Sequence, residues 1–489
     1  MLNHLKYMAK HSGIYMIGNV SSKLIGLILL PLYTSMIRIS DYGFYSLFDV
    51  SIQFCQGFLH LGLPNALFRW MNLEEGEQDK KAVFFTAYTF TALIVILVTL
   101  PLYFFSGYLA RGIFSNPAMG IYFKFSAAII TLSVLNMIPL FTLRVREKSV
   151  YYVIVAVLKF AVQLLVTVLM IVRYEKGILG IFWGQLMGEA LTFFLMLPFV
   201  WSQMSFRFLP VTLKEMIRFG FPLSFSGLAS RVLNIGDRYI LGFLTTLEMV
   251  GAYDIGYRIA NAVDIILIRS FNNAYQQMIW KHVRAANIRR IIRKFLNYFL
   301  FVFLWIILAV SVFSYDLVNL MTVTYDEYLA ASIIIPTILL ALVIRGMGFI
   351  FKQTLQMASK TAMIAYITLG SAVLNIGLNF LMIPRWGMQG AALATLLSFL
   401  FSSGISAWLS EKYFETHYEW LNMGKLFLSA ALIYISIQCL PALSLLSAIL
   451  AKLILLSLFP LLLYLFRFYE FREIDTLKKM LRNKSRKKM

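Results

Sequence analysis

The sequence of 489 residues contains few cysteines, few histidines and few charged residues. Its two cysteines, Cys55 and Cys439, both lie within long apolar segments, so the sequence supports neither a disulfide framework nor a cysteine-based metal site. It also lacks G-x-G-x-x-G, phosphate-loop and H-E-x-x-H patterns, and we therefore expect no bound cofactor or metal. The segments between the apolar runs are too short to carry a catalytic domain. These absences argue against an enzyme.

Apolar residues dominate the chain instead. Hydrophobic residues make up 60% of it, charged residues 14%, and the mean hydropathy is +0.76. A helix of roughly 20 apolar residues crosses the hydrocarbon core of a bilayer. We therefore predict an all-α polytopic membrane protein with 14 transmembrane helices. Charge-free runs predict five spans, at residues 82–105, 125–143, 295–313, 361–384 and 386–410. More polar segments predict the other nine, near residues 12–37, 42–70, 149–172, 178–201, 215–243, 249–278, 327–351, 424–440 and 443–466.

Lysine and arginine are distributed unevenly over this predicted bundle. With the N-terminus placed in the cytoplasm, 30 of the 44 lysines and arginines fall on the cytoplasmic side and 6 on the outer side. Because cytoplasmic loops are rich in these residues, both termini are predicted to be cytoplasmic. The basic tail then serves as an anchor to anionic lipid, and nucleic acid binding is not expected. The charged start precedes a long span without a cleavage site, so we expect no cleaved signal peptide.

Two short matches indicate an internal repeat. Gly43 and Gly251 stand in similar sequences near the start of two predicted spans, 208 residues apart. Gly177 and Gly387 form a second such pair, 210 residues apart. Because both matches fall at the same points of the helix order, we predict two six-helix lobes related by repetition. The predicted divisions are an N-lobe at 1–210, a C-lobe at 211–415, two appended helices at 416–466 and a basic cytoplasmic tail at 467–489.

Charged residues inside the predicted spans concentrate on the first two helices of each lobe. Within segment 249–278, a periodicity of 100° per residue aligns six polar side chains within an arc of about 80°. An arginine or lysine at the bilayer centre costs roughly 2.5 to 3.5 kcal/mol, so such residues generally face water or a partner. We therefore predict an aqueous cavity between the lobes, although snorkelling or local pairing would also accommodate single charges. The six aligned residues are Asp254, Arg258, Asn261, Arg269, Asn272 and Gln276.

Several motifs resemble those of a known family. The run SGIYMIGNVSSKLIG at 12–26, followed by PLYT at 31–34 and DYGFYS at 41–46, resembles the opening of Wzx-type polysaccharide flippases. NIGDRYILG at 234–242, followed by VGAY at 250–253, is similar to the corresponding second-lobe segment. These flippases belong to the multidrug/oligosaccharidyl-lipid/polysaccharide exporter superfamily. The resemblance covers the whole chain in length and helix order.

The resemblance implies a V-shaped pair of lobes around a central cavity. The implied activity is alternating-access transfer of an undecaprenyl-pyrophosphate-linked oligosaccharide repeat unit from the cytoplasmic to the outer leaflet of the bacterial inner membrane. The last two helices accommodate a lipid tail in some relatives, and contacts with the polysaccharide polymerase machinery are implied.

Side-chain chemistry suits such a cargo, because guanidinium groups bind phosphate and amides bind sugar hydroxyls. We expect pyrophosphate to be held by Lys23, Arg231, Arg238, Arg258 and Arg269. We expect sugar contacts from Gln53, Gln56, His60, Asn261 and Asn272. Carboxylates at Asp49, Asp237 and Asp264 are alternative sites for a coupling ion, Na⁺ or H⁺.

Two functions from the same superfamily stay open. A cation-coupled drug antiporter should have a predominantly acidic cavity and twelve helices, whereas this sequence has intramembrane cations and two further spans. A lipid II flippase would share most of the predicted features. A membrane glycosyltransferase or polysaccharide polymerase is disfavoured because no long loop is present to hold a catalytic site.

Overall fold

The computed structural model describes residues 28–73, 76–281, 283, 285–322, 325–440 and 444–469, and these residues form helices without any strand. Lys23 and most of the segment predicted over 12–37 lie outside the described residues. Nine described helical segments are long and apolar enough to cross a membrane. The protein is therefore an all-α, multi-pass membrane protein, as predicted, while the exact number of spans stays a prediction.

The longest helix matches two predicted spans at once. Helix α17 (Thr361–Phe414) has 54 residues and bends at Gly387, whose φ of 52° and ψ of −132° are not helical. The sequence predicted separate spans on the two sides of this position. Gly177, its partner in the repeat, has φ 52° and ψ −133° directly before α9 (Ile178–Gln203). This shared, glycine-favoured conformation supports the internal repeat.

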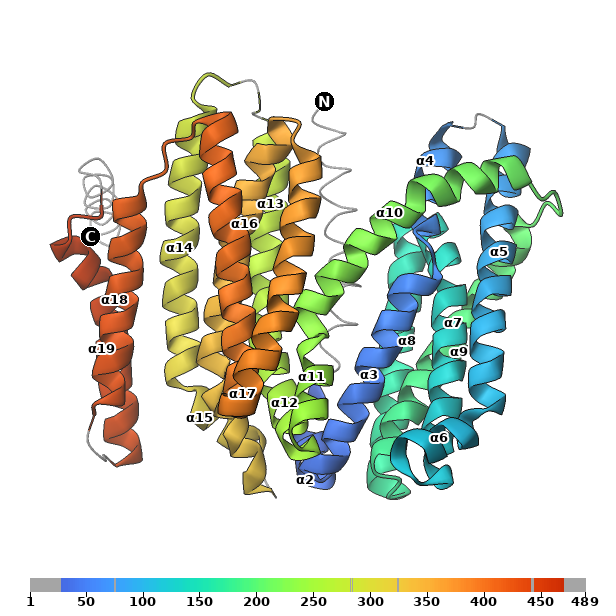
Figure 1. Cartoon of the computed structure of the whole chain (residues 1–489), viewed down its shortest axis with the longest axis horizontal. Helices are drawn as coiled ribbons and strands as arrows, with labels where there is room; N and C mark the ends of the chain where they lie inside the picture. Colours follow the sequence, from blue (N-terminus) through green and yellow to red (C-terminus); the bar gives the residue numbers. More distant parts are fainter. Residues whose placement is uncertain are drawn as a thin grey trace, which may run out of the picture.

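Two groups of helices form the two lobes (Figure 1). In the N-lobe, α7 packs against α5 and α9, and α9 packs against α8. In the C-lobe, α16 packs against α17 and α14, while the last two helices lie at the outer edge of this lobe, with α18 against α14. The further bounds are α2 (Leu30–Met36), α5 (Glu77–Phe104), α6 (Ser106–Phe114), α7 (Gly120–Val145), α8 (Ser149–Val168), α14 (Ile288–Val312), α15 (Ser314–Met321), α16 (Ile335–Met357), α18 (Trp420–Gln438) and α19 (Leu445–Leu465).

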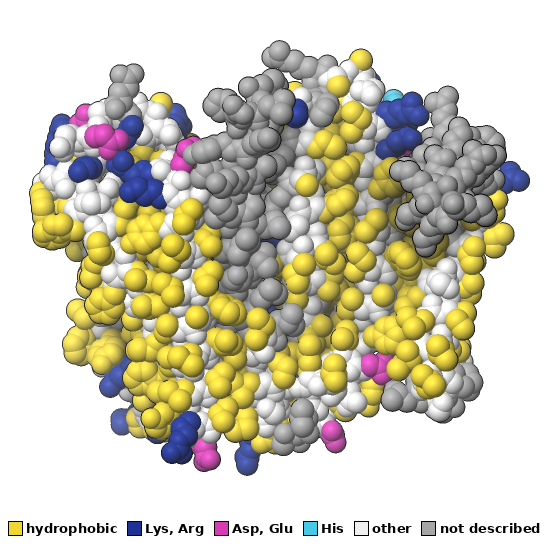
Figure 2. Space-filling view, turned by 180° about the vertical axis from the view of Figure 1, so that it is seen from behind, with side chains coloured by type: hydrophobic (Ala, Val, Ile, Leu, Met, Phe, Trp, Pro, Cys, Tyr) yellow, Lys and Arg dark blue, Asp and Glu magenta, His cyan; other side chains and the backbone are white. Residues whose placement is uncertain are grey.

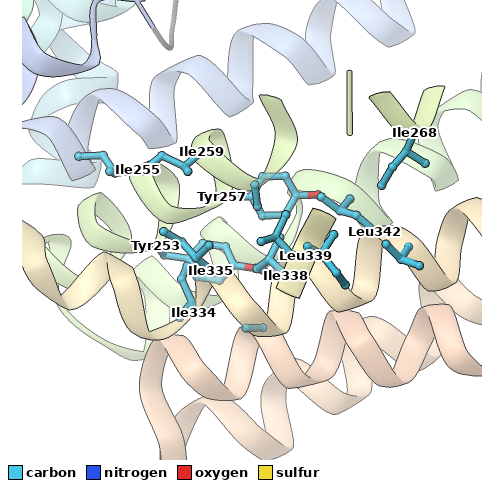
Figure 3. Close-up of a cluster of buried hydrophobic side chains, with 14 of the residues drawn as sticks. Tyr253, Ile255, Tyr257, Ile259, Ile268, Ile334, Ile335, Ile338, Leu339 and Leu342 are labelled. Carbon is cyan, nitrogen blue, oxygen red and sulfur yellow. The ribbon is translucent and has the colours of Figure 1, made fainter. Parts of the chain in front are cut away.

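Apolar side chains hold the lobes together internally and cover their outside. Figure 2 shows apolar side chains over the middle of one face, with lysine and arginine toward its ends. Inside the C-lobe, Tyr253 and Tyr257 of α12 lie among Ile335, Ile338 and Leu339 of α16 (Figure 3). All five side chains are buried. This packing fixes the charged helix α12 (Leu247–Val263) to the more apolar α16.

The second predicted span is shorter than expected. Helix α3 (Ile39–Leu59) ends before the predicted boundary near residue 70, and α4 (Leu63–Leu73) follows as a separate helix. Leu61 and Gly62 between them have positive φ values of 48° and 72°. A Cβ atom on Gly62 would lie 2.0 Å from the carbonyl oxygen of Gly220, so only glycine permits this close approach.

The predicted polar face of segment 249–278 is also interrupted. Five residues, Asp264–Ile268, form a π-helical turn between α12 and α13 (Arg269–Lys281). A π-turn adds a residue to the helical repeat and rotates everything after it. The prediction that one polar face continues along the whole segment at 100° per residue was therefore wrong beyond Asp264. Asn272 is accordingly buried, with only 7% of its surface exposed.

The lobes meet through α3 and α12, close to the first residues of both helices. A Cβ atom on Gly43 would lie 1.9 Å from the carbonyl oxygen of Leu247, and one on Gly251 would lie 2.3 Å from that of Ile39. The two contacts are related by the same 208-residue offset as the glycines. A pseudo-twofold relationship between the lobes therefore passes through this backbone contact, on the side predicted to be the outer one.

Helix α10 (Pro210–Ile235) contacts both lobes. It runs diagonally across the molecule in Figure 1 and packs against α4 and α5 as well as α17. At its N-lobe end, the ring of Phe219 lies 4.9 Å from the guanidinium carbon of Arg69. Helix α11 (Asp237–Leu244) continues the chain into the C-lobe. A change in the angle between the lobes must therefore bend or move α10.

Candidate functional site: two charged clusters within the lobes

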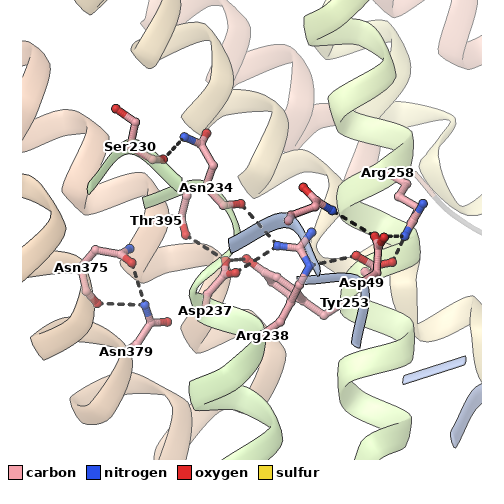
Figure 4. Close-up of polar contacts among 12 residues, drawn as sticks. Asp49, Ser230, Asn234, Asp237, Arg238, Tyr253, Arg258, Asn375, Asn379 and Thr395 are labelled. Atoms are coloured by element: carbon pink, nitrogen blue, oxygen red, sulfur yellow. Dashed lines mark hydrogen bonds and ion pairs between the residues drawn. The ribbon is translucent and has the colours of Figure 1, made fainter. Parts of the chain in front are cut away.

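A network of ion pairs lies at the lobe junction. Arg258 of α12 places Nη2 3.1 Å from Asp49 of α3 and Nε 2.6 Å from Asp254, one turn earlier on its own helix (Figure 4). The pair with Asp49 connects the lobes, whereas the pair with Asp254 stays within one lobe. Arg258 therefore keeps a carboxylate partner whether or not the lobes are in contact.

The same network continues deeper into the C-lobe. Arg238 of α11 lies 2.8 Å from Asp254 and 3.1 Å from Asp237, and its side chain is 3% exposed. Its guanidinium carbon is 4.4 Å from the ring centre of Tyr257. The Tyr253 hydroxyl donates a hydrogen bond to Asp237. Arg238 is thus enclosed by carboxylates and aromatic rings, which leaves it little access to a ligand.

The formal charges in this junction network do not cancel. Three carboxylates, at Asp49, Asp237 and Asp254, surround two guanidinium groups, at Arg238 and Arg258, which gives a formal charge of −1. Removing a net charge from water carries a large desolvation cost unless a counter-charge is close. A proton or a small cation would supply that charge.

Asp237 faces a second group of polar side chains. The Thr395 hydroxyl of α17 donates to Asp237 Oδ2 at 3.4 Å, and Asn375 and Asn379 of the same helix bond to each other (Figure 4). Asn379 donates to the side-chain oxygen of Asn375 at 3.1 Å, but its own side-chain oxygen has no hydrogen-bond partner. Asn375 and Asn379 are at most 1% exposed. These oxygens are suitable ligands for a hard cation.

A second cluster contains more positive than negative charge. Asp264 is fully buried, and its Oδ2 atom is 2.5 Å from Arg269 Nε and 2.6 Å from Arg345 Nη2. Arg345 of α16 also donates to the side-chain oxygen of Asn234 at 2.5 Å. One carboxylate therefore neutralises only one of these two arginines. Arg269 is the more exposed of them, at 43% of its side-chain surface.

Two further cations, Lys352 and Arg231, have no carboxylate partner among the described residues. Lys352, two turns beyond Arg345 on α16, donates to the Ser402 hydroxyl at 3.2 Å. Arg231 of α10 lies against α3 of the N-lobe, since a Cβ atom on Gly57 would be 2.3 Å from its Nε. We call Arg269, Arg345 and Lys352 the C-lobe cation cluster. With Asp264, this cluster has a formal charge of +2.

The residues expected to contact sugar have varied environments. Gln53 donates to Asp49 at 3.0 Å, and Gln56 donates to Ser133 of α7 at 2.9 Å. His60 Nδ1 accepts the backbone N–H of Gly62 at 2.9 Å. Asn272 faces the carbonyl oxygen of Gly346 at 3.5 Å. Only Asn261 is both partly exposed and without a side-chain hydrogen bond among the described residues.

Helical periodicity missed Arg345 and Lys352 as site residues. Arg345 and Lys352 are single charged residues within or beside an apolar segment, so they produce no periodic pattern. The six aligned polar residues of segment 249–278 do produce one. Their spacing of seven residues, which places both on one helical face, was the available signal. The packing of α16 against α12 and α13 then determines that this face meets Asp264.

An apolar groove lies on the C-lobe near the appended helices. Its volume is about 500 Å³, and its walls come from α14, α16, α17 and α18. None of its lining residues belongs to α19. Gln389 donates to Thr337 at 3.1 Å within it, so one of its few polar groups is satisfied. The groove is lined by Leu304, Ile307, Leu308, Ser311, Ile333, Pro336, Thr337, Leu340, Gln389, Leu393, Leu396, Phe427, Ala430, Ala431 and Tyr434.

Comparison with known families agrees with this arrangement. The model of the polysaccharide biosynthesis protein family matches residues 8–275, which is more than half of the chain. The chain belongs to the polysaccharide biosynthesis protein family. A second model, MatE, matches residues 222–381, in the C-lobe. These matches support membership of the multidrug/oligosaccharidyl-lipid/polysaccharide exporter superfamily, as the sequence motifs suggested.

Individual relatives extend the comparison. The chain is 24% identical over 208 residues to the probable low-salt glycan biosynthesis flippase Agl15 of Haloferax volcanii, covering 40% of this chain and 43% of that protein. The match thus spans less than half of that relative. The fold is similar to the lipid II flippase MurJ in an inward closed conformation, with a TM-score of 0.74, 16% identity and coverage of 92% and 98% of the two chains. It is also similar to an inward-facing multidrug resistance MATE family transporter, with a TM-score of 0.61, 14% identity and coverage of 81% and 93%.

Proposed function

We propose that this protein is a flippase that moves a polyprenyl-pyrophosphate-linked oligosaccharide across a bacterial cytoplasmic membrane. The cargo would enter from the cytoplasmic leaflet and leave into the outer leaflet by alternating access. Membership of a polysaccharide biosynthesis family and similarity to a glycan biosynthesis flippase support this class of cargo. In this proposal both termini are cytoplasmic, and the released glycan is passed to polymerase machinery.

The observation that carries the proposal is the excess positive charge of the C-lobe cation cluster. Unpaired cations within a membrane-spanning region generally face water or a substrate. A pyrophosphate group presents several anionic oxygens at once, and guanidinium groups bind such oxygens in bidentate fashion. Arg231 and Arg269 keep the role expected from the sequence, while Arg345 and Lys352 join them. Lys23 belongs to the same proposal.

Arg238 and Arg258 have a different role in this proposal. Both are held by carboxylates, so they organise the lobe junction instead of binding pyrophosphate. Glycan contacts are assigned to Asn261 first, because its amide is partly exposed and has no side-chain hydrogen bond among the described residues. Gln53, Gln56, His60 and Asn272 would contact sugar only after exchanging their present partners.

Alternating access requires the junction to open and close. In the present structure the lobes are joined at the predicted outer side by the Gly43–Gly251 contact and by the Arg258–Asp49 pair. Separation at this side breaks both. Because Arg258 keeps Asp254, opening exposes Asp49 but leaves no guanidinium group unpaired, which lowers the cost of the transition.

A coupling ion is assigned to Asp237. Of the three carboxylates considered, Asp264 pairs with two arginines. Asp49 and Asp237 each pair with one, but Asp237 takes its other hydrogen bonds from hydroxyl groups, whose oxygens can also bind a cation. Asp237 belongs to a network with a formal charge of −1 and accepts a hydrogen bond from Thr395 of α17. Na⁺ or H⁺ bound here would neutralise the network.

The apolar groove accepts the polyprenyl tail in this proposal. Its lining is almost entirely apolar, and the described α18 forms one wall. The cargo's charged head would then bind the C-lobe cation cluster while its tail remains in a hydrocarbon-like environment. From the resemblance we expected both appended helices to accommodate the lipid tail. In this assignment only α18 contacts the tail, because α18 contributes lining residues to the groove and α19 does not.

Complementation of a polysaccharide flippase deletion tests the proposal. The wild-type chain should restore surface polysaccharide, whereas Arg345→Gln with Lys352→Gln should not, at equal amounts of membrane-inserted protein. Arg207→Gln is the matched control, because Arg207 is exposed and pairs with Asp79 outside both clusters. Full polysaccharide from the double variant contradicts the proposal. Rescue of a lipid II flippase deletion, or drug resistance alone, supports one of the two alternatives instead.

A further inference from the structure

Asn234 lies between the two charged clusters. It is the penultimate residue of α10. Its side-chain oxygen accepts a hydrogen bond from Arg345 Nη1 at 2.5 Å, and its backbone carbonyl oxygen accepts one from Arg238 Nη1 at 3.3 Å. Arg345 belongs to the C-lobe cation cluster, whereas Arg238 belongs to the junction network. One residue of α10 thus connects a guanidinium group of each cluster, and Figure 4 shows its contact with Arg238.

The Asn234 amide is held in one orientation. Its Nδ2 atom donates to the carbonyl oxygen of Ser230, one turn earlier on α10, at 2.5 Å. This bond directs Nδ2 back along the helix and leaves Oδ1 for Arg345. Because Oδ1 and the backbone carbonyl belong to the same residue, a pull of Arg238 on the end of α10 acts directly on the contact with Arg345.

Arg238 divides one nitrogen atom between two acceptors. Its Nη1 atom lies 3.1 Å from Asp237 Oδ1 and 3.3 Å from the Asn234 carbonyl oxygen. A charged carboxylate attracts a guanidinium group more strongly than a neutral carbonyl does. While Asp237 is charged, the bond to Asn234 therefore stays long. Once Asp237 is neutral, Arg238 is drawn more closely to the Asn234 carbonyl oxygen.

Asn234 competes with phosphate at Arg345. Arg345 Nη2 is 2.6 Å from Asp264, and Nη1 donates to Asn234. A phosphate that binds a guanidinium group in bidentate fashion needs two of its N–H groups. The neutral amide is a weaker acceptor than the Asp264 carboxylate, so Asn234 is the partner that phosphate displaces. The Arg345 side chain is 23% exposed, so a ligand can approach it.

We propose that Asn234 is a positioning residue that couples the charge of Asp237 to pyrophosphate binding at Arg345. The inference rests on the proposed function and gives its ion coupling a residue and a sign. With Asp237 charged, the end of α10 is loosely held, and Asn234 yields Arg345 to pyrophosphate. With Asp237 neutral, Arg238 fixes Asn234 in its contact with Arg345, and pyrophosphate is released. Because coupling is reciprocal, bound pyrophosphate disfavours neutralisation of Asp237 by the same factor.

The sign of this coupling distinguishes it from simple charge attraction. Neutralising Asp237 makes the C-lobe more positive, so Coulomb attraction alone strengthens the binding of an anion. The contacts of Asn234 predict the opposite, which is weaker binding. Only this second effect requires the Asn234 side chain.

A double-mutant cycle on binding tests the proposal. The probe is polyprenyl pyrophosphate, titrated by microscale thermophoresis against the purified full-length protein in sodium-free buffer at alkaline pH. Asp237→Asn should bind it about fivefold more weakly than the wild type, the loss expected when one neutral hydrogen bond competes. In the Asn234→Ala background, Asp237→Asn should cause no loss. Asn319→Ala, at an exposed position of α15, is the matched control background and should keep the fivefold loss.

A second variant tests the competition itself. Asn234→Asp places a carboxylate against Arg345, which phosphate displaces less readily, so binding should fall about tenfold with Asp237 unchanged. Tighter binding by Asp237→Asn, or an equal loss with and without Asn234→Ala, overturns this inference while the proposed function stands. If the wild-type protein binds no polyprenyl pyrophosphate, the proposed function is wrong and the inference falls with it.

Discussion

Gly43 and Gly251 pack against each other through their backbones at the junction of the two lobes. Each belongs to a different half of the internal repeat, and a Cβ atom on either would overlap a carbonyl oxygen of the opposite helix. The contact is therefore possible in this form only with glycine at both positions. It makes the closed junction sensitive to the smallest substitution.

Gly43→Ala should weaken the closed junction. Overpacking at a tight contact costs about 1 to 3 kcal/mol, which shifts the closed-to-open equilibrium roughly 5- to 150-fold. We expect reduced export and increased labelling of a cysteine introduced at Ser46, which is buried and lies three residues after Gly43 on α3. Gly404→Ala is the matched control, because no atom lies within 4 Å of a Cβ there. Unchanged labelling in Gly43→Ala would contradict this role.

A double-mutant cycle should reveal the interlobe ion pair. Asp49→Asn and Arg258→Gln each remove the charge-assisted contact between α3 and α12. Since hydrogen bonds to charged groups contribute about 1.5 to 3 kcal/mol, the coupling free energy should fall in or just below this range. Thermal unfolding of the purified variants measures it. Strict additivity of the two single variants would show that the pair does not hold the lobes together.

The helix order and the repeat were predictable because they depend on local features. Apolar runs mark the spans, and Gly177 and Gly387 mark equivalent bends by a conformation that glycine favours. The polar face of segment 249–278 was predictable only up to Asp264. There a π-turn rotates the residues that follow it about the helix axis. Nothing in the residues 264–268 themselves signals that turn.

The state of each buried charge was not predictable from the sequence. From the sequence, Arg238 and Arg258 had the same expected role as Arg231, because all three are arginines within predicted spans of the C-lobe. Tertiary packing brings Asp49, from the other lobe, and Asp254 to two of them, while Arg231 receives no carboxylate among the described residues. Ion pairs between helices depend on the distances between side chains of different helices, and the periodicity of one helix does not reveal these distances. The proposed pyrophosphate site therefore includes Arg345 and Lys352 of α16, which the sequence did not suggest.

Asp237→Asn should uncouple transport from its ion. The amide removes the carboxylate's negative charge, so the junction network becomes formally neutral without Na⁺ or H⁺. We expect export in membrane vesicles to lose its dependence on the Na⁺ or proton gradient and to fall at least about tenfold, as expected when coupling free energy of more than about 1.4 kcal/mol is lost. Asp326→Asn, at the start of the 3₁₀ helix η4 (Asp326–Ile333) and outside both clusters, is the control. Gradient-dependent export in Asp237→Asn would place the ion elsewhere.

A bulky residue in the apolar groove should block the lipid tail. Ala430 lines the groove on α18, and Ala430→Trp fills part of its volume of about 500 Å³. Export of the long-chain cargo should fall by an order of magnitude or more, because apolar burial contributes roughly 25 cal/mol per Å². Leu432→Trp places the same ring on an exposed position of α18 and should transport normally. Equal export by the two variants would exclude the groove as the tail site.

The most direct test of the pyrophosphate assignment is flipping in proteoliposomes. The cargo would be a fluorescent polyprenyl-pyrophosphate oligosaccharide, compared with the corresponding monophosphate. Wild-type protein should flip the pyrophosphate form at least about tenfold faster, since the second phosphate adds charge-assisted contacts to Arg231, Arg269, Arg345 and Lys352. Arg345→Gln with Lys352→Gln should abolish that difference. If the double variant flips the pyrophosphate cargo at the wild-type rate, the C-lobe cation cluster does not bind it.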